Sequence, residues 1–155
     1  MKSKNILVFL FLFIVLQSQA QAVYVEVFGK GWVNSINYEH SLNNTVQGFN
    51  VQLGIGFLPT SLITIPASIN YVFGRKKHHF ELGGGVTYVN GMLWLDDDDF
   101  GPAFWIHSNL MYRYEKPQGK FFFKIGATPV ISRNFRIGPW FGIGLGYKFK
   151  PKKQS

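Results

Sequence analysis

The chain has 155 residues and no cysteine, and only 15% of its residues are charged, while 46% are hydrophobic and 17% are aromatic. Soluble domains average about 25% charged residues, so this composition excludes a disordered or disulfide-stapled chain and disfavours an ordinary soluble domain. The formal net charge is +8, and the 17 glycines and 16 phenylalanines favour strands over helices, because glycine weakens helices and aromatic residues suit strands. We therefore expect one all-β unit.

Residues 1–20 have the pattern of an export signal. Lys2 and Lys4 precede an unbroken apolar run from residue 6 to residue 16, and Ser18-Gln19-Ala20 forms a small-residue cleavage site. The apolar run is shorter than the roughly 20 residues that a helix needs to span a bilayer. We expect a cleaved signal peptide over 1–20 and an exported mature chain, with an N-terminal anchor helix as the alternative.

The rest of the chain alternates between apolar and polar residues with a period of two, which is a strong strand signal. The expected strands are 23–28, 32–42, 48–57, 63–73, 79–89, 103–114, 120–131 and 140–149. The first is the shortest, and the sequence leaves open whether 23–42 forms one kinked strand or two strands joined by Gly29-Lys30-Gly31. Two strands bring the total to an even number, which a closed barrel of this type needs.

The alternation does not say which face points into a barrel. Phe and Tyr are concentrated on the apolar face, whereas the other face holds glycines, amides and few charges. The interior of a barrel of about eight strands only just holds side chains, so the rings must point outward, to lipid. We expect a closed antiparallel up-and-down transmembrane β-barrel of about eight strands over 21–149. An exported soluble lipocalin-like barrel with the apolar face inside is the alternative.

The connections predict the orientation of this barrel. The tight polar ones are 43–45, 74–77 and 115–119, and the longer ones are 90–102 and 132–139. Outer-membrane barrels have short turns on the periplasmic side and longer loops outside. We therefore expect both termini, including the short basic tail 150–155, in the periplasm. Aromatic residues gather near the strand ends, as they do at both interfaces of a bilayer.

The last strand ends with Gly144-Leu145-Gly146-Tyr147-Lys148-Phe149. With the export signal and the eight alternating strands, this pattern resembles the small eight-stranded outer-membrane β-barrel proteins of Gram-negative bacteria. In that family a C-terminal Gly-x-x-aromatic-x-aromatic pattern is the signal read by the barrel-assembly machinery, and Gly144, Tyr147 and Phe149 match it. The resemblance implies the cell outer membrane as the location, and outer-membrane lipid and the barrel-assembly machinery as partners.

Charged residues are also expected inside the barrel, on the polar face of the strands. The acidic ones are Glu26, Glu39 and Glu81, and the basic ones are Arg113, Lys124 and Lys148. Amides at positions 37, 50, 52, 70 and 109 share this face with Trp105 and Trp140. Buried acids and bases are tolerated only when they are paired and hydrogen-bonded. We therefore expect a plugged polar lumen and a structural or surface-interaction role carried by the outer loops, with a narrow channel as an alternative.

Two charged runs could bind ions. Asp96–Asp99 offers carboxylates to calcium or magnesium, but it lacks the glycine-spaced ligands of recognisable calcium loops, so a solvated loop is the better interpretation. His78 and His79 follow the basic residues 75–77 and could bind a metal or an acidic partner, but a solvated basic turn is favoured. We expect no metal and no cofactor. The aromatic residues are assigned to the lipid-facing surface, so no basic stripe with rings that could stack on bases remains. We therefore also expect no nucleic-acid partner.

Some barrels of this size modify lipids, so catalysis has to be considered. A hydrolase needs a serine, a histidine and an acid that converge on one side. His107 and Ser108 are adjacent, as are His40 and Ser41, so each pair points to opposite faces of a strand. We expect no catalytic residue, with a lipid-modifying enzyme as an alternative function.

Overall fold

The computed structural model describes residues 21–43, 45–57, 63–90, 103–131, 137–138 and 141–149. The expected signal peptide 1–20, the tail 150–155 and the Asp96–Asp99 run lie outside these residues. Within the described ranges, no helix has the length and apolar character needed to cross a bilayer.

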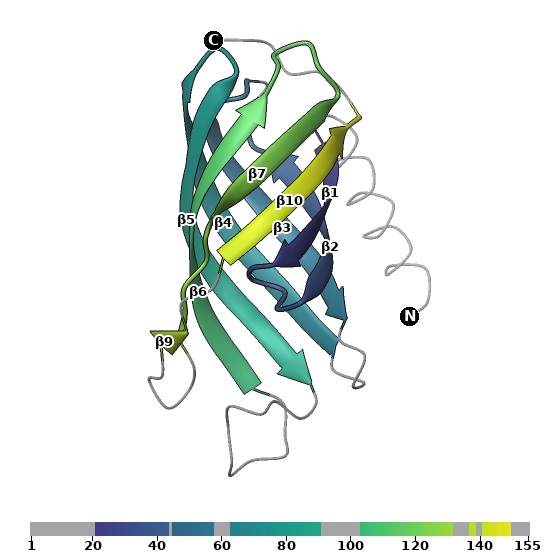
Figure 1. The fold of residues 1–155 in the computed structure, drawn as a ribbon, viewed down its shortest axis with the longest axis vertical. Helices are drawn as coiled ribbons and strands as arrows, with labels where there is room; N and C mark the ends of the chain where they lie inside the picture. The colour runs from purple at the N-terminus through teal and green to yellow at the C-terminus, as the bar shows by residue number, and fades with distance from the viewer. Residues whose placement is uncertain are drawn as a thin grey trace, which may run out of the picture.

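The described chain forms one antiparallel sheet that closes on itself (Figure 1). Its strands are β1 (Gln21–Phe28), β2 (Asn34–Ser41), β3 (Gly48–Phe57), β4 (Ile63–Arg75), β5 (His78–Asn90), β6 (Ala103–Glu115), β7 (Phe121–Ala127), β8 (Val130–Ile131), β9 (Ile137–Gly138) and β10 (Phe141–Lys148). Neighbours follow the order β5-β4-β3-β2-β1-β10-β7-β6, and β5 also pairs with β6, which closes the ring. The expected all-β, eight-stranded up-and-down barrel is confirmed.

The two short strands continue longer ones. Ala127 in β7 pairs with Leu110, and Val130 in β8 pairs with His107, so β7 and β8 keep one register against β6. Pro129 lies between them and has no N–H to donate, which interrupts the ladder; its carbonyl still accepts a hydrogen bond from Ser108 N at 3.0 Å. In the same way, β9 pairs with β8 in the register in which β10 pairs with β7, so β9 continues β10. The strand expected over 120–131 is therefore present, with a break at the proline.

Residues 23–42 form two strands rather than one. β1 pairs with β2 on one side and with β10 on the other, and so closes the barrel. In the turn 29–33 between them, Phe28 N donates to Val33 O at 2.8 Å and Trp32 N to Gly29 O at 3.0 Å. Phe28, Gly29 and Trp32 have φ values of 56°, 96° and 75°, in the left-handed region that glycine adopts easily and other residues rarely do. β2 therefore begins at Asn34, not at 32 as expected.

Burial alternates along the strands and separates the two faces. The outward face of the wall carries large apolar side chains that are exposed, for example Phe104 at 67%, Phe121 at 66% and Leu145 at 62%. The inward face carries buried polar and charged side chains, among them Glu39, Gln52 and Arg113. The apolar face is therefore on the outside of the barrel.

The two ends of the barrel differ. We call the end with the β4–β5 and β6–β7 turns, at the top of Figure 1, the short-turn end, and the opposite end the loop end. β4, β5 and β6 have 13 residues each, whereas β1, β2 and β10 have 8. At the loop end, β5 and β6 consequently extend well beyond the β1–β2 turn (Figure 1).

Candidate functional site: the barrel lumen

The short-turn half of the lumen is built around Arg113 of β6. Its Nη1 donates to Glu39 Oε1 of β2 at 2.8 Å and lies 3.4 Å from Glu81 Oε2 of β5. Its Nε lies 2.5 Å from Glu115 Oε2, and its guanidinium lies 4.2 Å from the centre of the Phe122 ring. The flat, permanently charged guanidinium can contact several carboxylates at once. One buried arginine thus connects three buried acids.

Two lysines complete this arrangement. Lys124 Nζ of β7 lies 2.8 Å from Glu39 Oε2 and 2.7 Å from Glu81 Oε2, while Lys148 Nζ of β10 lies 2.7 Å from Glu115 Oε1. We call the set Glu39, Glu81, Arg113, Glu115, Lys124 and Lys148 the ion-pair cluster. All six side chains are buried, and they come from five strands, so the cluster crosses the lumen.

The cluster contains five of the six charged residues singled out in the sequence, together with Glu115. The sequence pattern predicts Glu115 in the turn 115–119, but Glu115 is the last residue of β6 and faces inward. Extending the alternation of positions 111 and 113 by one more step would have found it. Glu26 lies apart from the cluster, under the β1–β2 turn, and its Oε2 has no hydrogen-bond partner among the described residues.

A second group of buried contacts links the cluster to the β1–β2 turn. Lys30 is only 3% exposed, and its ammonium donates to Tyr24 Oη at 2.6 Å and to Gln52 Oε1. The amide nitrogen of Gln52 donates to Glu81 Oε1 at 2.6 Å and to Glu39 Oε2 at 3.2 Å. No local sequence signal predicts the role of Lys30, because a lysine between two glycines is typical of an exposed turn.

The β1–β2 turn itself folds into the loop half of the lumen. Thr87 Oγ1 of β5 donates to Lys30 O, and Thr64 Oγ1 of β4 donates to Gly31 O, both at 3.0 Å. Trp32, the first residue of the strand expected over 32–42, is buried and meets Trp105 of β6 edge to face, with ring centres 4.8 Å apart. The positive φ of Trp32 turns its side chain inward. The side chain of Trp140 lies outside the described ones.

Amide side chains on the inner face connect three strands of the barrel wall. Asn109 Nδ2 of β6 donates to Asn70 Oδ1 of β4 at 2.6 Å, and Asn70 Nδ2 donates to Asn50 Oδ1 of β3 at 3.2 Å. The first bond passes over β5, where Gly83 pairs with both Asn70 and Asn109. A Cβ on Gly83 would lie 2.1 Å from Asn70 Oδ1, so the contact between the two asparagines requires glycine at this position.

Comparison with known proteins adds one finding. No family model and no curated protein sequence matches this chain. Among solved structures, the N-terminal β-barrel domain of Pseudomonas aeruginosa OprF is similar, with a TM-score of 0.62 over 84% of this chain and 96% of that domain. The two sequences are 13% identical. The likeness shows a shared barrel fold.

The remaining candidate residues that the structure describes do not come together in a site. His107 faces the lumen and Ser108 the outside, while Ser41 is buried and His40 is half-exposed on the other face. Thr87 uses its single proton on Lys30 O, so the 3.0 Å contact with His107 Nδ1 is donated by the histidine. His78 is exposed and His79 buried. Among the described residues, no three His, Asp or Glu side chains are grouped closely enough to hold a metal ion.

The three residues of the expected assembly signal lie on opposite faces of the last strand and beyond its end. Gly144 faces the lumen beside Tyr24. Tyr147 and Phe149 point outward and contact each other, with ring centres 5.8 Å apart, and Tyr147 also contacts Phe121 at 5.3 Å. The two aromatic rings thus form part of the exposed surface at the short-turn end.

Proposed function

We propose that this protein is an integral outer-membrane β-barrel with a filled polar lumen, and that it acts as a structural or surface-interaction protein through its longer loops. The observation that carries the proposal is the distribution of polarity across the wall. Exposed apolar side chains cover the outside, and buried charges occupy the inside. A soluble barrel has the reverse distribution, whereas a barrel in lipid needs this one.

Three further observations support a membrane location. The closed sheet pairs strand with strand all the way round, as the absence of water in a bilayer requires. Exposed apolar surface of this extent is costly in water and marks a partner or a membrane. The export signal expected over 1–20 and the match of Gly144, Tyr147 and Phe149 to the assembly signal favour the Gram-negative outer membrane in particular.

Cell fractionation tests this proposal. The full chain, with its own signal, is produced in a Gram-negative cell, and membranes are washed with carbonate. We expect the protein to stay in the outer-membrane fraction and to migrate faster in electrophoresis when the sample is not heated, because a closed barrel resists detergent. Release into the soluble periplasmic fraction would refute the proposal and favour the soluble lipocalin-like barrel.

The filled lumen is proposed to prevent stable conductance. Its support is the ion-pair cluster at one level and the inward-folded β1–β2 turn at another, with Gln52 between them. Eight strands leave an interior that side chains can fill. The purified protein in planar bilayers is expected to show no steady current. Stable ion-selective channels would instead favour the narrow-channel alternative.

The barrel-assembly machinery is the proposed folding partner. Tyr147 and Phe149 are exposed at the end of the strand that must pair with β1 to close the barrel. Their joint replacement by alanine is expected to leave the protein degraded in the periplasm, whereas removal of 151–155 is expected to be tolerated. Normal levels of the double alanine variant would contradict this role. We propose no enzymatic activity, since His107 is engaged by Thr87 and Ser108 faces away from it. We also propose no nucleic-acid partner, since the exposed aromatic rings belong to the apolar outer face.

A further inference from the structure

The short-turn end of the barrel carries an open groove between two turns. Lys76 and Lys77 from the β4–β5 turn and residues 116–119 from the β6–β7 turn line a space of about 780 Å³. The two turns are tied together, because Glu115 N donates to Lys77 O at 2.9 Å. Lys116 O accepts from Gly119 N at 3.0 Å and from Lys148 Nζ at 3.3 Å. The backbone on both sides of the groove is thus held in place.

The residues around this groove are basic. Lys76, Lys77 and Lys116 line it, and Arg75 and Lys120 flank it, all exposed. The neighbouring Glu115 points away into the lumen and is engaged by Arg113 and Lys148. In the part of the chain that the structure describes, no carboxylate pairs with any of the five cations. Cations gathered without counter-charges repel one another and attract an anionic ligand.

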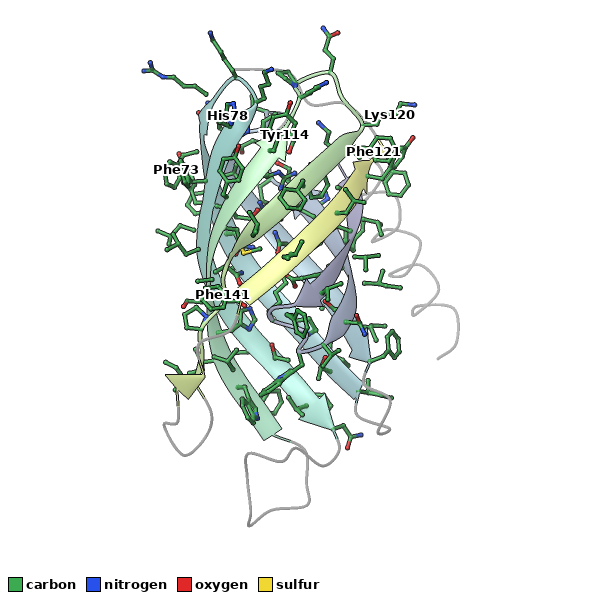
Figure 2. The ribbon with its side chains drawn as sticks, viewed as in Figure 1. Phe73, His78, Tyr114, Lys120, Phe121 and Phe141 are labelled. Atoms are coloured by element: carbon green, nitrogen blue, oxygen red, sulfur yellow. The ribbon has the colours of Figure 1, made fainter. Side chains whose placement is uncertain are left out.

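Exposed aromatic rings indicate the level of the groove relative to the lipid bilayer. A row of rings crosses the outer surface near the short-turn end, from Phe49 and Tyr71 through Phe73 and Phe80 to Tyr112, with neighbouring ring centres 4.9 to 6.3 Å apart. Figure 2 shows His78 and Lys120 toward the very end of the barrel, beyond Phe73 and Phe121. Aromatic side chains of membrane proteins concentrate at the headgroup level. The groove beyond them is then level with the lipid phosphates.

We propose that this groove binds the anionic headgroup of a phospholipid in the leaflet that the short turns face. Lys76, Lys77 and Lys116 contact the headgroup phosphate from two sides. Clustered lysines at a membrane surface are known to select anionic lipids, and a lysine ammonium suits phosphate as a compact point charge. This inference rests on the proposed membrane location, and it adds a specific partner to it.

Lipid retention in nanodiscs tests the groove. The barrel is reconstituted in discs that contain equal amounts of phosphatidylglycerol and phosphatidylcholine, and native mass spectrometry counts the lipids that stay bound after release. We expect the unmodified protein to retain phosphatidylglycerol preferentially. The double variant Lys76→Gln, Lys77→Gln should lower this preference about tenfold, since each cation near a membrane surface contributes several-fold.

A matched variant separates the groove from general charge. Arg75→Gln with Lys120→Gln also removes two positive charges from this end, but from residues that do not line the groove. Because these two side chains would act on the lipid only through the screened surface potential, the loss of preference should be about threefold or less, clearly smaller than in the groove variant. An equal loss in both double variants would overturn the groove in favour of diffuse attraction. The absence of any preference in the unmodified protein would overturn it as well.

Two further arms identify the source of the anion. Inorganic phosphate is titrated into the protein in lipid-free detergent, and purified peptidoglycan is used in a pelleting assay. Binding in either arm that is lost in Lys76→Gln, Lys77→Gln but kept in Arg75→Gln, Lys120→Gln, together with no preference for phosphatidylglycerol in the discs, would assign the groove to that ligand and overturn the lipid assignment. Failure of every variant to enter bilayers, seen by vesicle flotation, would instead contradict the membrane proposal itself.

Discussion

In the short-turn half of the lumen, side chains from five strands meet in one ion-pair cluster, whereas in the loop half a backbone turn folds inward and is held by Thr64, Thr87 and Trp105. The cluster joins parts of the wall that are far apart in the sequence, such as Glu39 and Lys124. The turn joins one hairpin to the opposite wall. Loss of a cluster residue should therefore weaken the whole barrel, whereas loss of a turn contact should first free the turn.

The largest effect is expected from Arg113→Ala. This variant leaves Glu39, Glu81 and Glu115 buried without their shared partner, and stranding buried charges of this kind costs about 3–5 kcal/mol. The free energy of unfolding, measured in urea with the protein in detergent or vesicles, should fall by this amount. Arg75→Ala, at an exposed position without an ion pair in the described part of the chain, serves as the control and should stay within about 0.5 kcal/mol. Similar midpoints for the two variants would mean that the cluster does not stabilise the barrel.

The next effect is expected from Trp32→Ala in the loop half. Removal of a buried tryptophan usually costs about 3–5 kcal/mol, and here we expect about 3 kcal/mol or less because the turn can relax around the gap. Hydrogen exchange should show faster loss of protection at the amides of Phe28 and Trp32 than in the strands. A uniform loss across the barrel would show that the turn and the cluster unfold together, contrary to the comparison.

The sequence could predict the short-turn half far better than the loop half, for a physical reason. Alternation with a period of two assigns a face to every residue of a regular strand, so Glu39, Glu81, Arg113, Lys124 and Lys148 could be placed inside from their positions alone. Glu115 was missed because the predicted strand ends at residue 114, one residue before β6 ends in the structure. Which acid meets which base depends on the stagger between strands, which no single strand encodes.

A turn at 29–31 was one of the two interpretations of the sequence, but its inward fold could not be predicted, because the turn breaks the alternation. Trp32 and Phe28 adopt positive φ, and this backbone conformation redirects Trp32 and Lys30 into the lumen. No local sequence signal predicts a positive φ for an aromatic residue that lies beside a glycine-containing turn. The partners Thr64 and Thr87 are also distant in the sequence, so only the closed barrel brings them to the turn.

A smaller effect is expected where two adjacent glycines differ in their surroundings. A Cβ on Gly83 would meet Asn70 Oδ1 at 2.1 Å and the backbone oxygen of Ile69 at 2.4 Å, whereas a Cβ on Gly84 would meet only His107 O, at 3.2 Å. Gly83→Ala should therefore cost about 1–3 kcal/mol, as overpacking does, and should disturb the bond between Asn70 and Asn109. Gly84→Ala should cost clearly less. Equal unfolding midpoints in urea would show that the amide bridge over β5 does not constrain the wall.

The smallest effect is expected from Thr64→Val, which keeps the shape of the side chain and removes one hydrogen bond to Gly31 O. A single neutral hydrogen bond contributes about 0.5–1.5 kcal/mol, so the global midpoint should hardly move. Because Thr87 still holds Lys30 O, the turn should remain in place but open more often, and exchange at the Trp32 amide should become several times faster. Thr64→Val together with Thr87→Val removes both tethers, while Lys30 keeps its side-chain contacts with Tyr24 and Gln52. If exchange in the double variant is no faster than in Thr64→Val alone, the threonines do not restrain the turn, and the packing of Trp32 on Trp105 must hold it.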